Sequence, residues 1–191
     1  MEHIDPRHLL IKVVEVLEEL KIPYAITGGM AVFVWAKPRF TADIDIIILL
    51  DLQDVEKLSD ALLKISEYGY LDKDDMWNAL RRHGEFNFID GASGVKVDFW
   101  VLGGDSFGKD QIKRRTPKEV LNKKVFFVSP EDLILSKLLW AKESESEFQL
   151  RDVESVLKIQ KKLDWVYLKK WAKKQSTFEI LSEVKKKSKN E

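Results

Sequence analysis

The sequence contains no cysteine, no net charge and no long run of apolar residues. Without cysteine, disulfide bonds, thiolate chemistry and cysteine-ligated zinc are excluded. No apolar run reaches the roughly 18 residues that a membrane helix needs. The first ten residues contain acidic side chains and an early proline, where a signal peptide would have a basic stretch followed by an apolar one. We therefore expect a protein without membrane contact that resides in the cytoplasm.

Charge is nevertheless abundant, because the 32 basic and 32 acidic side chains cancel one another. Hydrophobic residues make up 45% of the 191 residues, which excludes a disordered chain and predicts one core with room for a small helical annex. Lysines concentrate after Lys161, and we interpret them as solvated helix faces rather than a polyanion site.

The order of helix and strand patterns predicts an α/β fold, a mixed sheet flanked by helices. An amphipathic helix is predicted over Pro6–Leu20, a strand over Tyr24–Thr27 and a buried helix over Met30–Ala36. The β-branched run Ala42–Leu50 is apolar on both faces in its later part, which is typical of a central strand.

The second half begins with strands and continues with helices. A hairpin is predicted from Glu85–Ile89 and Val95–Val101, the segment 105–115 is either helix or loop, and Val120–Val128 contains one more strand. Ser129 followed by Pro130 is typical of a helix start. The helices predicted after it are Pro130–Ala141, Phe148–Gln160, Asp164–Lys173 and Thr177 to about Lys187. We therefore divide the chain into a core, 1–128, and a helical part, 129–191.

Three aspartates are the strongest candidates for chemistry. Asp43 and Asp45 lie two apart on one predicted strand, so their carboxylates face the same side about 6.5 to 7 Å apart. Asp98 supplies a third carboxylate from another strand, and hard oxygen ligands of this kind suit Mg²⁺ or Mn²⁺. The alternative is an exposed strand end whose aspartates cap a loop, because a D-x-D pattern is common by chance.

A glycine pair between a strand and a helix adds context to the aspartates. Gly28 and Gly29 follow the apolar run that ends at Thr27. Missing side chains at such a place let phosphate approach the backbone N–H groups at the helix start. Together these features predict a two-metal site for phosphoryl transfer.

The segments ITGG at 26–29, DID at 43–45 and VDF at 97–99 resemble the motifs of the DNA polymerase β superfamily of nucleotidyltransferases. The resemblance implies that Asp43 and Asp45 bind two Mg²⁺ or Mn²⁺ ions. It further implies that Asp98 binds the catalytic ion and helps to activate the acceptor, while Gly28 and Gly29 hold the triphosphate. Gly29 stands where many members have serine, a variant that the family tolerates.

A finer resemblance links PRFTADID, SPEDLILSKLLWAKES and LRDVESVLK to the nucleotidyltransferase toxins of AbiE-type toxin/antitoxin systems. It implies nucleotide-binding roles for Arg39, Thr41 and Lys137, and a functional role for Asp152. From the residues alone, Lys137 is either a snorkelling surface lysine or an anion ligand, and its truncation should cost little stability. Asp152 could equally form a helix-surface ion pair worth less than about 1 kcal/mol.

The predicted function is transfer of a nucleoside monophosphate from a triphosphate such as ATP to a hydroxyl or amine acceptor. The acceptor is an RNA end such as that of tRNA, a protein side chain or a small molecule. Two alternatives stay open: a toxin-type regulator with a cognate antitoxin, and a non-catalytic nucleotide-binding module of the same fold. The tryptophans are expected mainly in the core rather than stacked on bases.

Overall fold

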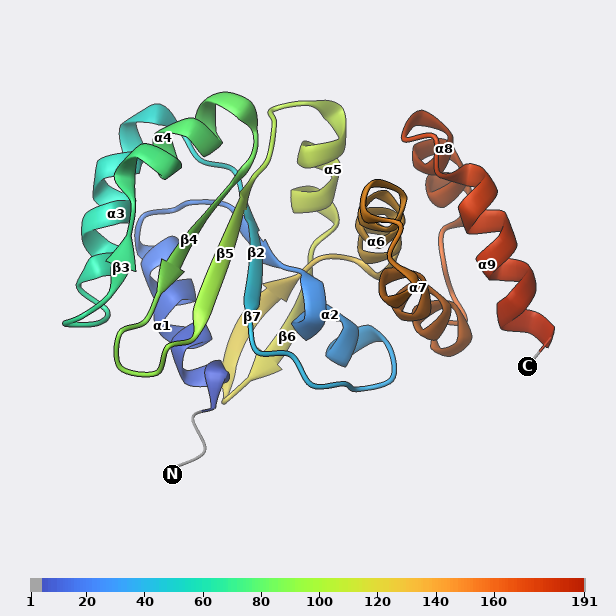
Figure 1. Ribbon diagram of the computed structural model, residues 1–191, viewed down its shortest axis with the longest axis horizontal. Coiled ribbons are helices and arrows are strands. Elements are labelled where there is room, and N and C mark those ends of the chain that lie inside the picture. Colours follow the sequence, from blue (N-terminus) through green and yellow to red (C-terminus); the bar gives the residue numbers. More distant parts are fainter. Residues whose placement is uncertain (1–4, 191) are drawn as a thin grey trace.

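A mixed sheet lies at the centre of the protein (Figure 1). The structure is a computed structural model that describes residues 5–190, and within them the sheet has seven strands in the order β3-β4-β5-β2-β1-β7-β6. The strands are β1 (Tyr24–Ile26), β2 (Ile44–Ile48), β3 (Tyr70–Leu71), β4 (Glu85–Ile89), β5 (Lys96–Val101), β6 (Thr116–Val120) and β7 (Lys123–Phe127). The pairs β2–β5 and β1–β7 are parallel and the other neighbours are antiparallel. The predicted mixed sheet is confirmed.

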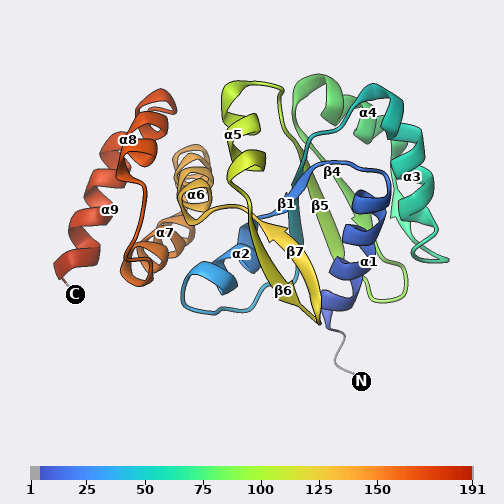
Figure 2. The ribbon, with the colours of Figure 1, turned by 180° about the vertical axis from the view of Figure 1, so that it is seen from behind.

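Helices surround this sheet on several sides. They are α1 (Pro6–Glu19), α2 (Gly28–Trp35), α3 (Val55–Leu63), α4 (Lys73–Arg82), α5 (Ser106–Arg114), α6 (Pro130–Ser144), α7 (Glu147–Ile159), α8 (Trp165–Lys174) and α9 (Phe178–Asn190), with a 3₁₀ turn at Leu52–Asp54. Figures 1 and 2 show α6 to α9 gathered beyond α2 and α5, while α3 and α4 lie at the opposite end. No helix in residues 5–190 is long and apolar enough to cross a bilayer.

The central strand β2 is apolar because both of its faces are covered. Ile44, Ile46 and Ile48 are fully buried, and Ile47 is nearly so. A strand with both faces packed reads as a continuous apolar run rather than an alternating one, as in many parallel sheets. Asp45 is the exception in this strand, which marks it as a residue kept for a reason other than packing.

A second hairpin was not predicted. The strand expected within Val120–Val128 is β7, but its antiparallel partner β6, joined to it by Leu121 and Asn122, was not expected. Both turn residues have positive φ, 48° and 63°, as a two-residue hairpin turn with the favoured twist requires. Pro117 and the charged residues of β6 obscured the strand pattern, and proline is tolerated there because β6 is an edge strand. The segment left open at 105–115 contains helix α5.

Helix α6 begins where the sequence predicts, at the Ser129 cap. Ser129 Oγ accepts from the Asp132 N–H at 3.1 Å and donates to Asp132 Oδ2 at 2.6 Å. The predicted boundary at 128/129 falls between β7 and α6. Whether the two parts are separate units stays a prediction.

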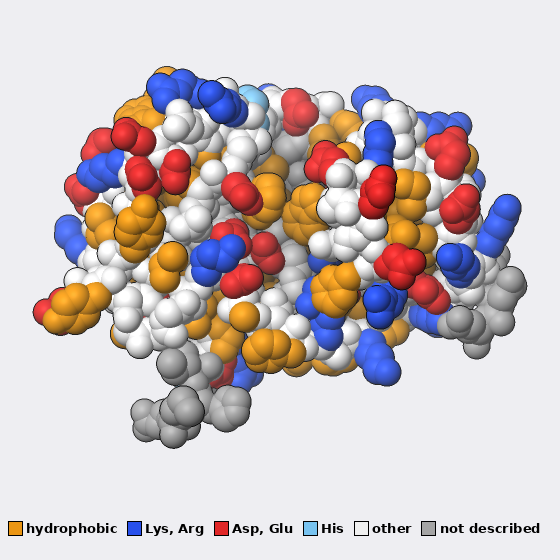
Figure 3. Space-filling view, in the orientation of Figure 1, with side chains coloured by type: hydrophobic (Ala, Val, Ile, Leu, Met, Phe, Trp, Pro, Cys, Tyr) orange, Lys and Arg blue, Asp and Glu red, His pale blue; other side chains and the backbone are white. Residues whose placement is uncertain are grey.

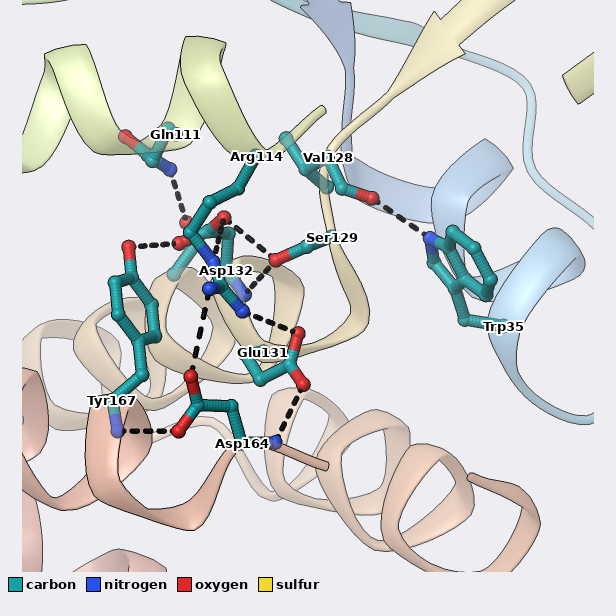
Figure 4. Close-up of polar contacts among 10 residues, drawn as sticks. Trp35, Gln111, Arg114, Val128, Ser129, Glu131, Asp132, Asp164 and Tyr167 are labelled. Carbon is teal, nitrogen blue, oxygen red and sulfur yellow. Dashed lines mark hydrogen bonds and ion pairs between the residues drawn. The ribbon is translucent and has the colours of Figure 1, made fainter. Parts of the chain in front are cut away.

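The first turn of α6 is tied to its neighbours by a buried polar network (Figure 4). Tyr167 of α8 donates its hydroxyl to Asp132 Oδ1 at 2.7 Å. Arg114 of α5 lies over the Tyr167 ring and donates to Glu131 at 3.1 Å, while the Asp164 N–H donates to Glu131 at 2.8 Å. The network therefore joins α5, α6 and α8.

Burial raises the pKa of Asp132 from 3.8 to about 6, against the opposing hydrogen bonds from Ser129 and Tyr167. Because the folded-state value is the higher one, the folded protein holds a proton that the unfolded chain releases. This contribution to stability is present below about pH 4 and is lost as the pH rises through about 6.

We therefore expect the stability advantage of the wild type over Asp132→Asn to shrink between pH 4 and pH 7. The change in the difference should be on the order of 2 to 3 kcal/mol, because each pKa unit corresponds to about 1.4 kcal/mol. Urea unfolding at both pH values measures it, with Asp51→Asn at an exposed position as the control. A difference independent of pH would contradict the assignment.

Candidate active site

The turn between β1 and α2 needs glycine at its first position. Gly28 has φ of +59°, and a Cβ there would lie 1.8 Å from Asp45 Oδ2. The Thr27 N–H donates to the Asp45 carbonyl at 2.9 Å, which fixes the turn against β2. A Cβ on Gly29 would lie 2.4 Å from Thr41 Oγ1. The turn therefore packs directly on two of the predicted site residues.

Gly28→Ala should lower the free energy of unfolding by more than Gly94→Ala does. Both glycines have positive φ, but the space around Gly94 is open, with no atom within 4 Å of an added Cβ. Gly94→Ala thus reports the backbone strain alone, about 1 kcal/mol, while Gly28→Ala adds the collision with Asp45. Thermal unfolding of the two variants compares them, and equal losses would contradict the close packing.

The register of two parallel strands brings two carboxylates together. Asp45 of β2 pairs directly with Asp98 of β5, so their side chains are neighbours on one face of the sheet, with the strands about 4.8 Å apart. Burial, and next the charge of Asp98, raise the pKa of Asp45, against the charge of Lys137 and the Gly29 N–H. Asp43 lies one residue before β2 begins, although it was predicted within the strand.

A cavity of about 450 Å³ opens beside these residues. Of the predicted site residues it is lined by Gly29, Arg39, Thr41, Asp43, Asp45 and Lys137. Gly28 and Asp98 do not line it but adjoin Asp45. Figure 3 shows acidic side chains over β2 and β5, next to α6 and α7. Residues from the sheet and from α6 thus face one space.

The three aspartates are not arranged as a finished metal site. Within residues 5–190 no group of three or more acidic or histidine side chains is placed to hold a metal ion. One oxygen of Asp98, Oδ2, is instead paired with Lys96 Nζ at 2.7 Å. Their carboxylate oxygens are still the donors that Mg²⁺ and Mn²⁺ prefer, and Asp45 and Asp98 are adjacent. The donor set fits such ions, and metal binding stays a prediction.

Asp152 holds two cations from distant parts of the chain. Arg39 donates to both of its oxygens from Nε and Nη2, each at 2.9 Å, and Lys137 Nζ lies 2.9 Å from Oδ2. The side chains of Lys137 and Asp152 are only 3% and 6% exposed. The interpretations of Lys137 as a snorkelling lysine and of Asp152 as a surface ion pair are therefore wrong.

The buried position changes the electrostatics of both groups. Burial lowers the pKa of Lys137, and the neighbouring Asp152 opposes that shift. Burial acts to raise the pKa of Asp152, but the hydrogen bonds from Arg39 and the charge of Lys137 bring it below its usual value. The expectation that truncating Lys137 costs little stability is also overturned, because the change would remove one side of a buried ion pair.

Asp152→Asn should lower the free energy of unfolding by about 3 kcal/mol, because Lys137 would be left buried without a counter-charge. The double variant Lys137→Met/Asp152→Leu should recover part of that loss, since it removes both buried charges and leaves only Arg39, which is 25% exposed, without its partner. Glu154→Gln, which breaks a more exposed pair on the same helix, is the control and should cost less than about 1 kcal/mol. Denaturant unfolding gives all three values, and an unaffected Asp152→Asn variant would refute the argument.

An aromatic wall of the cavity was missed by the sequence analysis. Trp100 and Trp140 line it with their ring centroids 5.5 Å apart, and Phe148 lies under the Arg39 guanidinium at 4.4 Å. Trp35 and Trp171 are buried, and Trp77, Trp100 and Trp165 pack against the core, as expected of most tryptophans. The available signal was spacing: Trp100 follows Asp98 by two residues on β5, which places both on one face.

Gln149 lines the cavity beside the aromatic wall, and the orientation of its side-chain amide is defined. Its Oε1 accepts from Lys137 Nζ at 2.7 Å. A lysine ammonium can only donate, so the amide oxygen must face it and the amide NH₂ must point elsewhere. Because Gln149 lines the cavity, the group that it can offer to a ligand is a donor.

Comparison with known proteins identifies the family. A family model described as "Nucleotidyltransferase of unknown function (DUF6036)" matches residues 8–190. The chain belongs to this nucleotidyltransferase family. No curated protein matches its sequence.

Solved structures of nucleotidyltransferases share the fold at low sequence identity. The lincosamide adenylyltransferase LnuA is 16% identical with a TM-score of 0.54, over 82% of this chain and 98% of its own. ANT(2")-Ia with adenylyl-2"-tobramycin is 15% identical with a TM-score of 0.56, over 91% and 97%. A nucleotidyltransferase-like protein from Paracoccidioides brasiliensis is 20% identical with a TM-score of 0.55, over 95% and 93%. No finding bears on the AbiE-type resemblance, which stays a prediction.

Proposed function

We propose that this protein transfers a nucleoside monophosphate from a nucleoside triphosphate to a hydroxyl or amine acceptor. The observation that carries the proposal is the direct pairing of Asp45 with Asp98, beside a glycine turn and at the edge of a cavity. Two like charges this close together are costly away from solvent unless a cation compensates them. Membership in a nucleotidyltransferase family supports the same conclusion.

Asp43, Asp45 and Asp98 would hold divalent ions, Mg²⁺ or Mn²⁺. When bound, such ions neutralise charge on the triphosphate and on the leaving pyrophosphate. The aspartates differ in what they contribute. Asp45 is positioned from both sides by Gly28 and Asp98, whereas Asp43 precedes the strand and lines the cavity.

The triphosphate is proposed to lie between the glycine turn and α6. Gly29 offers backbone close to the start of α2, where anions are favoured. Lys137 faces the cavity from α6 with its ammonium fixed by Asp152 and Gln149, and its charge acts on Asp45. A cation held in this way is preorganised for phosphate and needs no rearrangement on binding.

The aromatic wall is proposed to bind the flat part of a substrate. Trp140 and Trp100 offer ring surface, and the Gln149 amide donor can reach an acceptor atom of a heterocycle. Two structural neighbours are named with lincomycin and with an adenylylated tobramycin, so small hydroxylated molecules are the first acceptors to test. RNA ends and protein side chains follow, with an antitoxin partner as a further prediction.

Asp45→Asn and Asp43→Asn should each reduce nucleotide transfer by about 100-fold or more, because each removes a carboxylate that would bind the ions neutralising the reacting phosphates. Transfer is measured with labelled triphosphates, Mg²⁺ and small-molecule, RNA and protein acceptors. Without metal, Asp45→Asn should unfold at the same or a higher temperature than wild type at pH 8, since burial and Asp98 disfavour the charged form of Asp45.

Asp60→Asn, at an exposed position on α3, is the matched control and should keep wild-type transfer. Wild-type rates in Asp45→Asn at limiting Mg²⁺ would disprove the proposed role. Absence of transfer by the wild type to every acceptor class would favour a non-catalytic binding module.

A further inference from the structure

Lys96 closes the open side of Asp98. Its Nζ lies 2.7 Å from Asp98 Oδ2, and the two residues are two apart on β5 and so share a face of the sheet. The side chain of Asp98 is 12% exposed whereas that of Lys96 is 40% exposed. The lysine thus reaches in from solvent and covers a carboxylate that is otherwise mostly enclosed.

The surroundings explain why a cation settles at this position. The cross-strand partners of Lys96 and Asp98 on β4 are Ile89 and Asn87, neither of which carries a charge. Asp43 and Glu85 add negative potential, and together with Asp98 they raise the pKa of Lys96, the hydrogen bond to Asp98 being the largest cause. Among the described residues, Lys96 is the one cation that forms an ion pair with a predicted metal ligand, and that ligand is Asp98.

We propose that Lys96 is a built-in counter-ion that competes with the catalytic metal ion for Asp98 and must leave this carboxylate before that ion binds. This inference rests on the proposed function, because it concerns the same metal site. An ammonium group and a divalent ion cannot both occupy Oδ2, since each needs the same lone pairs and the two charges repel.

Lys96 can leave Asp98 easily because its ammonium group stays in contact with solvent both when it is paired with Asp98 and when a metal ion has displaced it. Its four-carbon stem is flexible and its head is strongly hydrated, so it can turn into solvent at little cost. The pair therefore neutralises Asp98 while the site is empty and yields to an ion of higher charge. In the metal-free protein the ammonium of Lys96 is bound to one oxygen of Asp98, so the aspartates need not already have the geometry of a metal site.

The test is Mn²⁺ binding by the full-length protein, followed through the electron paramagnetic resonance signal of free Mn²⁺. Lys96→Met keeps the stem and removes the charge, and it should bind Mn²⁺ about tenfold more tightly than wild type, because a charge-assisted competitor is lost. Lys96→Gln should behave in the same way, whereas Lys96→Arg should bind no more tightly than wild type. Lys73→Met is the control, since Lys73 is 42% exposed and pairs with Glu56 at 2.8 Å away from the aspartates.

A second readout is thermal unfolding with and without Mn²⁺. Metal-free Lys96→Met should melt below the wild type, because the aspartates lose their counter-ion, and it should gain more from Mn²⁺ than the wild type does. Lys73→Met should show no extra gain. This readout separates competition for metal from a general loss of stability.

The possible failures are distinguishable. If the wild type binds Mn²⁺ and both neutral Lys96 variants bind it equally or more weakly, the role of Lys96 is overturned and the proposed function stands. If neither the wild type nor either variant binds Mn²⁺, both proposals fall together. Binding by the neutral variants alone would support the competition.

Discussion

Electrostatic repulsion between two carboxylates is the constraint on which the site depends. Parallel pairing of β2 with β5 sets Asp45 beside Asp98, in a sheet whose neighbouring residues are mostly apolar. The surrounding features can be understood as ways of tolerating this charge. Gly28 gives Asp45 room, Lys137 contributes positive charge from α6, and Lys96 covers Asp98 from the solvent side. Each of these comes from a different element of the fold.

The helices after the sheet complete this arrangement rather than merely covering it. Asp152 of α7 holds Lys137 of α6 and Arg39 of the loop between α2 and β2, so one carboxylate positions cations from both parts of the chain. The network around Asp132 fixes the start of α6 to α5 and α8. Because α6 is anchored at its first turn, Lys137 two turns later is held at a defined height beside the sheet.

Features that depend on local chemistry could be predicted from the sequence. The helix at Ser129-Pro130 follows from capping and the central strand from its isoleucines. Strand geometry was wrong in one detail, because Asp43 lies just before β2, although Asp43 and Asp45 both line the cavity. The adjacency of Asp98 could be proposed only from the motif order. Its direct pairing with Asp45 is a matter of sheet register, which no local pattern specifies.

Features that depend on distant partners could not be predicted in this way. Arg39 and Asp152 are 113 residues apart, so neither neighbourhood reveals that Asp152 is buried and paired. The aromatic wall escaped for a related reason, because a tryptophan beside a cavity and one inside a core occupy the same apolar helix or strand face. The hairpin of β6 and β7 escaped because Leu121 adopts a left-handed conformation that leucine rarely takes.

The shared carboxylate of Asp152 also has a consequence for how this protein can change over generations. A substitution at Asp152 leaves Lys137 and Arg39 without their common partner, and a substitution at Lys137 leaves Asp152 with Arg39 alone. A protein that carries only one of these replacements is therefore less stable than one that carries none of them. Arg39, Lys137 and Asp152 should be inherited as a unit, retained together or replaced together, even among relatives whose acceptors differ.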